Sequence, residues 1–391
     1  MSDSLKKIDL YIQSREEDLA RLSDEIFDLA EISMKEHQSC QKIEAYLDKE
    51  GFRVEHGVGG LDTAFRAVYE TGTNGFSVGL IAEYDALPMG HGCAHHLQAP
   101  AIIGAALAIK ELCKDIPVKI VVYGTPAEEA IGGKVLMLEN GCFQDIDIAV
   151  MTHGSNLTSA EFRCMALENF RVTFHGKPSH AAGSPEKGRS AFDAVLLSFQ
   201  GIEFLREHVK DDTRMHYTVL NAGGPTNVVP AEATAEYTLR SYQTEYLKEV
   251  VSRFMKILDG AALMTDTTYT YERDPAYTSN ITCPTLDLLL MKYAEIYGAK
   301  QVGKREGGSG STDFGNVSYA LPGACLNIAF CDPSGVAHSE DYLKAGKTKS
   351  AHEAISCSAK TIAATCVEII QDSSLQQKIL EEFNQNKEGA N

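Results

Sequence analysis

The sequence predicts an α/β fold, a mostly parallel mixed sheet flanked by helices, with an α+β domain inserted into it. Apolar, β-branched-rich runs alternate with helix-like segments over residues 76–154, which is typical of a parallel sheet covered on both faces. From about residue 166 the pattern changes to alternating strands and amphipathic helices. The 391 residues also exceed what one hydrophobic core usually serves, so two domains are expected.

The first domain is predicted to be discontinuous, formed by residues 1–165 and 277–391. Helical apolar spacing covers residues 5–32, and a second helix ends at Gly51. The expected later elements are strands in 76–88, 118–129 and 147–154, a helix over 99–113, a helix near 285–297, a strand over 324–330 and a long helix from about 348.

The inserted domain is predicted to span residues 166–276. Its pattern predicts an exposed antiparallel strand near 167–176, further strands near 215–224 and 232–242, and amphipathic helices over 189–209 and 246–262. Two helices on one face of an antiparallel sheet make a self-contained module.

The charge and composition of the chain exclude some classes of binding partner. The net charge of -18 argues against nucleic acid and anionic membranes, because both require a basic face. The N-terminus lacks the apolar stretch of a signal peptide, and nowhere do 18 apolar residues follow one another. We therefore expect a cytoplasmic protein that keeps its ten cysteines mostly reduced and buried.

Residues 90–101, "GHGCAHHLQAPA", place Cys93 two residues before His95. A thiolate, imidazoles and a carboxylate are the side chains that bind zinc and similar metals, and the chain offers further ligands at Glu129, His153 and His338. Each alone has an ordinary explanation, such as a buried cysteine or a core histidine. Polar residues at the carboxyl ends of parallel strands, here Asp85, Glu128 with Glu129, and His153, meet at one edge of the sheet and favour a metal site.

Glu128 beside Glu129 adds a second requirement of hydrolysis, because one carboxylate can hold a metal while its neighbour takes a proton from the metal-bound water. The competing hypothesis is a thiol-dependent hydrolase with Cys93 as nucleophile. It leaves three further potential ligands and the acidic pair unexplained.

The order of these blocks resembles the co-catalytic metallopeptidases, and within them the indole-acetyl-amino-acid and aminobenzoyl-glutamate hydrolases. The resemblance covers nearly the whole chain, through "YDALP", "GHGCAHH", "TPAEEAIGGK", "MTHG", "GGPTNVVPAEATAEYTLRS", "GSTDFGNVSYALPG" and "VAHSEDY". It implies a zinc-peptidase-like catalytic domain and an inserted lid or dimerisation domain. It also implies a metal-dependent hydrolase of N-acyl amino acids, aminobenzoyl-glutamate-type conjugates or short dipeptides.

By this resemblance Glu128 is the general base, His180 stabilises the transition state, and Asn227 and Arg240 bind the substrate carboxylate. Two divalent metal ions are implied, and a thiolate ligand favours zinc, with manganese as the alternative. The resemblance also implies a homodimer in which His180 and Asn227 reach the active site of the partner protomer. The implied metal ligands are Cys93, His95, Glu129, His153 and His338.

The sequence departs from the resembled pattern in its opening motif. That pattern reads H-A-C-G-H followed by Asp or Asn, whereas this chain has Gly92, Ala94 and His96 at the differing positions. Ala94 requires a backbone that tolerates a Cβ atom there. We expect His91 and His96 to support the ligands, with an additional ligand at His96 as the alternative.

Two other interpretations stay open. Arg240 alternates with Leu239 on a predicted strand and could face water, and "GGPTN" is good turn sequence whatever its function. The chain could also be a non-catalytic or regulatory subunit of a hetero-oligomer, although the retained ligands and Glu128 argue against this.

Overall fold

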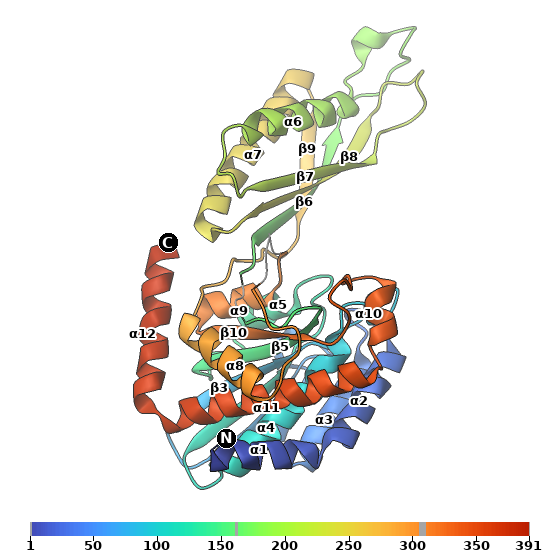
Figure 1. Ribbon diagram of the computed structural model, residues 1–391. Coiled ribbons are helices and arrows are strands. Elements are labelled where there is room, and N and C mark those ends of the chain that lie inside the picture. The colour runs from blue at the N-terminus through green and yellow to red at the C-terminus, as the bar shows by residue number, and fades with distance from the viewer. Residues whose placement is uncertain (1, 161–162, 305–309, 391) are drawn as a thin grey trace. The chain divides into compact units, whose positions relative to one another are not determined.

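The structure is a computed structural model that describes residues 2–160, 163–304 and 310–390 (Figure 1). The chain divides into two compact units. The first combines Met1–Arg163 with Asn280–Gly389, and the second contains the segment Cys164–Ser279.

A six-stranded sheet with the order β1-β2-β4-β3-β5-β10 forms the centre of the first unit. The strands β3, β4, β5 and β10 are parallel, as predicted, while β1 and β2 add an antiparallel edge that the sequence patterns did not indicate. The parallel strands place their carboxyl ends along one edge of the sheet. The bounds are β1 Arg53–His56, β2 Phe65–Thr71, β3 Phe76–Ala82, β4 Val118–Gly124, β5 Ile148–Ser155 and β10 Gly323–Ala329.

The predicted helices of the first unit are present, with one correction, and the short helices α5, α9 and α10 were not predicted. The expected continuous helix over 5–32 breaks at Ser14 and Arg15, where the Ser14 hydroxyl donates to the Tyr11 carbonyl and competes with the helical backbone bonds. Among the described residues no helix is long and apolar enough to cross a membrane. The bounds are α1 Asp3–Gln13, α2 Glu16–Leu29, α3 His37–Lys49, α4 Gln98–Cys113, α5 Gly133–Glu139, α8 Pro284–Ile296, α9 Phe314–Ala320, α10 Glu340–Ala345, α11 Lys349–Gln371 and α12 Ser373–Ala390.

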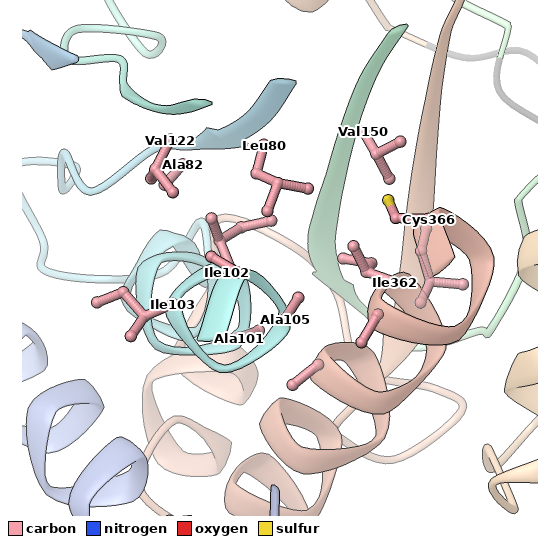
Figure 2. Packing of buried hydrophobic residues seen from close by; sticks show 14 of the residues in the cluster. Leu80, Ala82, Ala101, Ile102, Ile103, Ala105, Val122, Val150, Ile362 and Cys366 are labelled. Atoms are coloured by element: carbon pink, nitrogen blue, oxygen red, sulfur yellow. The ribbon is translucent and has the colours of Figure 1, made fainter. Parts of the chain in front are cut away.

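The main core of the first unit lies between the sheet and the helices α4 and α11. Figure 2 shows Ile102 of α4 near Leu80 of β3, and Ile362 and Cys366 of α11 near Val150 of β5. Full burial of one such aliphatic side chain contributes about 1.5–3 kcal/mol. The apolar contacts therefore hold the strands, and with them the loops at their carboxyl ends, in fixed positions.

The second unit contains an antiparallel sheet with the order β7-β8-β6-β9 and two helices packed on one face. The strand β6 is not exposed as expected, because it pairs with β8 on one side and β9 on the other, and every second residue is buried. The strand β9 was not predicted. The bounds are β6 Ala166–His175, α6 Ala191–Arg206, β7 Arg214–Asn221, β8 Glu232–Ser241, α7 Thr244–Thr265 and β9 Thr268–Arg273. The predicted fold class is confirmed in both units.

Candidate metal centre

The five predicted ligands come from different parts of the sequence and gather at the carboxyl edge of the parallel strands. The ligand atoms of Cys93, His95 and Glu129 lie within 4.8 Å of one another, and those of His95, His153 and Glu83 do the same. His338, in the loop after β10, places its Nε2 atom 3.2 Å from Glu129 Oε1. The structure thus brings together one thiol, three imidazoles and the carboxylate of Glu129.

His95 lies at the centre of this cluster and is fully buried. Its Nδ1 atom is 3.0 Å from both the backbone carbonyl and the Oδ1 atom of Asp85. Its Nε2 atom has no hydrogen-bond partner among the described residues, although Glu83 Oε2 is 3.3 Å away without hydrogen-bond geometry. Because buried polar atoms are almost always satisfied, this nitrogen is an open position for a metal ion.

Asp85 holds two of the candidate ligands at once. One carboxylate oxygen faces His95, and the other accepts hydrogen bonds from the Ser33 hydroxyl at 2.7 Å and from the Glu129 backbone N–H at 3.0 Å. Burial alone would raise the pKa of Asp85, but the interactions with His95, Glu129 and Ser33 outweigh it and lower the pKa below its usual range. Asp85 therefore stays ionised and fixes the orientation of the imidazole.

Left-handed backbone occurs at one candidate ligand, His338, and directly beside others, at Ala94 and Ala127. Ala94, Ala127 and His338 have φ angles of 68°, 61° and 60°. This conformation costs a non-glycine residue roughly 1–2 kcal/mol, so the surrounding structure must impose it. The backbone at Ala94 does accept a Cβ atom in this conformation.

His91 and His96 connect the ligand loop to other segments of the first unit through their Nε2 atoms. His91 Nε2 lies 3.1 Å from the Ile26 carbonyl, and His96 Nε2 lies 2.9 Å from the Gly346 carbonyl. Burial lowers the pKa of His91 to about 4, so its ring is neutral at physiological pH. Neither histidine belongs to a group of close ligand atoms among the described residues, which favours the supporting role over ligation.

Glu128 faces a second group of charged side chains. Its carboxylate lies within 4.8 Å of those of Glu83 and Asp313. Desolvation in the site raises the pKa of Glu128, and the two neighbouring carboxylates raise it further. Lys134 Nζ lies 2.6 Å from both Glu83 and Asp313. The sequence predicted no role for Glu83, Lys134 or Asp313, although all three lie next to or within the motifs that carried the resemblance.

The predicted substrate residues belong to the second unit. His180 and Asn227 are exposed and lie in adjacent loops, which are joined by a backbone hydrogen bond of 2.9 Å from Ala181 N–H to the Asn227 carbonyl. Arg240 is half-buried near the opposite end of β8, and burial lowers its pKa. From the start of β8 to Arg240 the strand extends about 26 Å, at about 3.3 Å per residue. The structure thus brings His180 and Asn227 together but keeps Arg240 apart from them.

Comparison with known proteins identifies the family. Residues 167–265 match the peptidase dimerisation domain. The chain is 31% identical over 389 residues to the Xaa-Arg dipeptidase of Mus musculus, with 95% of this chain and 90% of that protein covered. The chain belongs to the M20 family of metallopeptidases. It is also similar to one of the subunits of the p-aminobenzoyl-glutamate hydrolase of Escherichia coli, at 30% identity over 464 residues, with 98% of this chain and 96% of that protein covered.

The M20 fold is also found in solved structures. A dinuclear metal-binding M20 peptidase from Bacillus subtilis has a TM-score of 0.71 at 18% identity, with 92% of this chain and 99% of that chain covered. The predicted family is therefore confirmed, and so is the enzyme class, a metal-dependent hydrolase of the aminoacylase or dipeptidase type.

Proposed function

We propose that this M20 protein hydrolyses the amide bond of small N-acyl amino acids, aminobenzoyl-glutamate-type conjugates or dipeptides at a centre for two divalent metals. The observation that carries the proposal is the buried Nε2 atom of His95, which has no hydrogen-bond partner in the described part of the chain and lies among further metal-ligating groups. The names of the relatives support the substrate class, since they include a dipeptidase and an aminobenzoyl-glutamate hydrolase.

The donor set fits zinc, because zinc accepts thiolate, imidazole and carboxylate together, and manganese is the alternative. The metal ions would be held by Cys93, His95, Glu129, His153 and His338. When bound, they would supply Lewis-acid chemistry, which lowers the pKa of a water molecule and polarises the substrate carbonyl.

Glu128 is the proposed general base. It directly precedes Glu129, so one carboxylate of the pair can bind metal while the other remains available for proton transfer. Glu128 would take the proton of the attacking water and deliver it to the leaving amine. His180 would donate a hydrogen bond to the carbonyl oxygen as negative charge develops there.

We also propose a homodimer formed through the second unit. The strand β7 lies at the edge of its sheet, and edge strands readily pair with another chain. Large apolar side chains are exposed on β7 and on α6, with Phe204 71%, Leu220 50% and Leu196 46% exposed. This segment belongs to the region that matches the peptidase dimerisation domain.

The dimer would assemble the substrate contacts from two protomers. Asn227 and Arg240 lie near opposite ends of β8, so one chain cannot apply both to the same carboxylate within this unit. Arg240 would instead meet the substrate together with His180 and Asn227 of a second copy. The alternative is a hetero-oligomer, which is favoured by the name of the Escherichia coli relative, because that name describes a subunit of its hydrolase.

A substrate panel tests the activity. N-acyl amino acids, aminobenzoyl-glutamate, and β-alanyl and γ-aminobutyryl dipeptides would be assayed with the purified chain and added zinc or manganese. We expect hydrolysis of at least one class by this chain alone. No hydrolysis with either metal would contradict the proposed activity if the purified chain is a homodimer. If the chain is instead monomeric, the result would require a second kind of subunit. Measurement of the oligomer mass in solution separates these two outcomes.

Subunit exchange tests the shared site. His180→Ala protein and Glu128→Gln protein should each be inactive, whereas a hybrid dimer would contain one site with both residues intact. Random exchange of equal amounts should restore about a quarter of wild-type activity, because half of the dimers would then be hybrids with one working site each. No recovery after demonstrated exchange would place each site within a single chain.

A further inference from the structure

Three fully buried charged side chains lie next to the candidate metal centre and have no part in the proposed proton transfer. They are Glu83, Lys134 and Asp313, whose side chains are 1%, 0% and 0% exposed. Lys134 Nζ lies 2.6 Å from Glu83 Oε1 and 2.6 Å from Asp313 Oδ1. Charged groups are rarely buried so completely, and removal of one partner leaves an unpaired charge in a desolvated site.

Lys134 connects three segments that are distant in sequence. It lies in the first turn of α5, while Glu83 follows β3 and Asp313 precedes α9. The helices α5 and α9 lie side by side (Figure 1). Asp313 binds Lys134 twice, because Oδ1 accepts from the ammonium group and Oδ2 accepts from the Lys134 backbone N–H at 2.9 Å.

The turn before Lys134 carries the proposed base and one proposed ligand. At its start, Ala127 N–H donates to Glu36 Oε1 at 3.0 Å, and in its middle, Glu129 N–H donates to Asp85 Oδ2 at 3.0 Å. Lys134 holds the other end through Asp313. The turn that contains Glu128 is therefore fixed at three points.

Lys134 also determines the position of Glu83. The two oxygens of this carboxylate have different partners, since Oε1 faces Lys134 and Oε2 accepts from Gln98 Nε2 at 2.6 Å. The Oε2 atom lies 3.3 Å from His95 Nε2, the nitrogen that faces the candidate centre. An ion pair on Oε1 and a hydrogen bond on Oε2 thus hold the carboxylate of Glu83 beside the imidazole of His95.

We propose that Lys134 is a positioning residue of the metal centre, which holds Glu83 against His95 and fixes the turn that carries Glu128 and Glu129. The inference rests on the proposed function for its catalytic consequence, while its consequence for metal affinity can be measured separately. The competing explanation is structural, in that Lys134 neutralises two buried carboxylates and stabilises the fold without any effect on the centre.

Four variants separate the two explanations. Lys134→Met keeps most of the length of the side chain and removes its charge. Asp313→Asn is the matched control, because its amide oxygen can still accept one hydrogen bond from Lys134 at the end of the turn, and the pair of Lys134 with Glu83 stays in place. The double variant Lys134→Met/Asp313→Asn has the same net charge as the wild type at these three positions, with Glu83 no longer held. Glu83→Gln keeps the shape of the side chain and the pair of Lys134 with Asp313.

Zinc affinity would be measured by competition with a chromogenic chelator, and unfolding by thermal denaturation. Supporting groups around metal ligands typically contribute about 10- to 100-fold in affinity, so Lys134→Met and Glu83→Gln should bind zinc at least about 10-fold more weakly, and Asp313→Asn within about 3-fold of the wild type. The double variant should recover the thermal stability lost in Lys134→Met but not the zinc affinity. If the wild type is active, kcat should fall in Lys134→Met and Glu83→Gln, while KM changes little.

Recovery of both stability and zinc affinity in the double variant would overturn the proposal. If neither Lys134 variant folds, Glu83→Gln decides, because wild-type zinc affinity in that variant would show that the held position of Glu83 has no effect on the centre. If the wild type binds zinc but hydrolyses none of the panel, the proposed function fails while the affinity comparison still decides the role of Lys134.

Discussion

The candidate metal centre and the paired loops of His180 and Asn227 are built in opposite ways. In the first, His95 and Asp85 are buried, and several side-chain hydrogen bonds fix each of them. In the second, both side chains are exposed, and the loops are held mainly by backbone bonds. The metal centre is thus preorganised within one unit, whereas exposed loops become a site only when another surface meets them.

Glu128→Gln tests the proposed base of the preorganised metal centre and should have the largest effect on activity. The amide cannot accept the proton of the attacking water, so we expect kcat to fall by at least about 100-fold, within the usual range for a general base. Metal content should stay at the wild-type level. Glu129→Gln is the matched control in the adjacent position and should lose metal. Substantial activity in Glu128→Gln would remove Glu128 from the role of base.

Cys93→Ser tests the thiolate within the same centre. A hydroxyl stays protonated near neutral pH, so the variant should retain less metal after dialysis, with a changed pH dependence of binding. Elemental analysis measures this directly. Two tightly retained metals in the serine variant would exclude Cys93 as a ligand.

Arg240→Ala tests the second unit. A guanidinium that binds a desolvated carboxylate contributes on the order of 2–3 kcal/mol, or roughly 30- to 150-fold in kcat/KM. We expect KM to rise by this order for substrates with a free α-carboxylate and much less for their amides. An equal effect on both would mean that Arg240 does not recognise the carboxylate.

Asp85→Asn should weaken metal binding about 10- to 100-fold, because the amide no longer favours the same orientation of His95. Asp147→Asn offers a control carboxylate that binds the backbone and hydroxyl of Ser77 in the same sheet. It should leave metal affinity unchanged. Similar losses in both variants would point to a general effect on the fold.

His180→Ala should have the smallest effect on stability. Exposed side chains without buried partners usually change the free energy of unfolding by less than about 0.5 kcal/mol. We therefore expect wild-type thermal unfolding together with a loss of activity. A clear decrease in stability would show that the loop is held more firmly than its exposure indicates.

The sequence patterns predicted the elements that have strong periodicity and missed those that do not. The core strands and α4 are apolar and long enough to recognise, whereas β1 has four residues and β9 is mostly exposed. The candidate ligands could be proposed from residue types at strand ends. Asp85 also lies at such an end, but the sequence did not predict its contacts with His95 and Glu129.

The contacts that the sequence could not predict depend on tertiary structure. Glu83, Lys134 and Asp313 are far apart along the chain, and each alone is typical of a surface charge. Only the packing of α5 and α9 beside the end of β3 brings them together. In the same way, the motif that contains Asn227 and Arg240 is continuous in sequence, but an intervening extended strand separates the two residues.

The most direct test of the central claim is metal removal and replacement on the wild-type chain. We predict that chelation abolishes amidase activity and that zinc or manganese restores it in proportion to bound metal, up to two ions per chain. Alkylation of the stripped protein at Cys93 should prevent this recovery. Activity that survives complete removal of metal but is lost on alkylation would contradict the account and favour a thiol-dependent hydrolase.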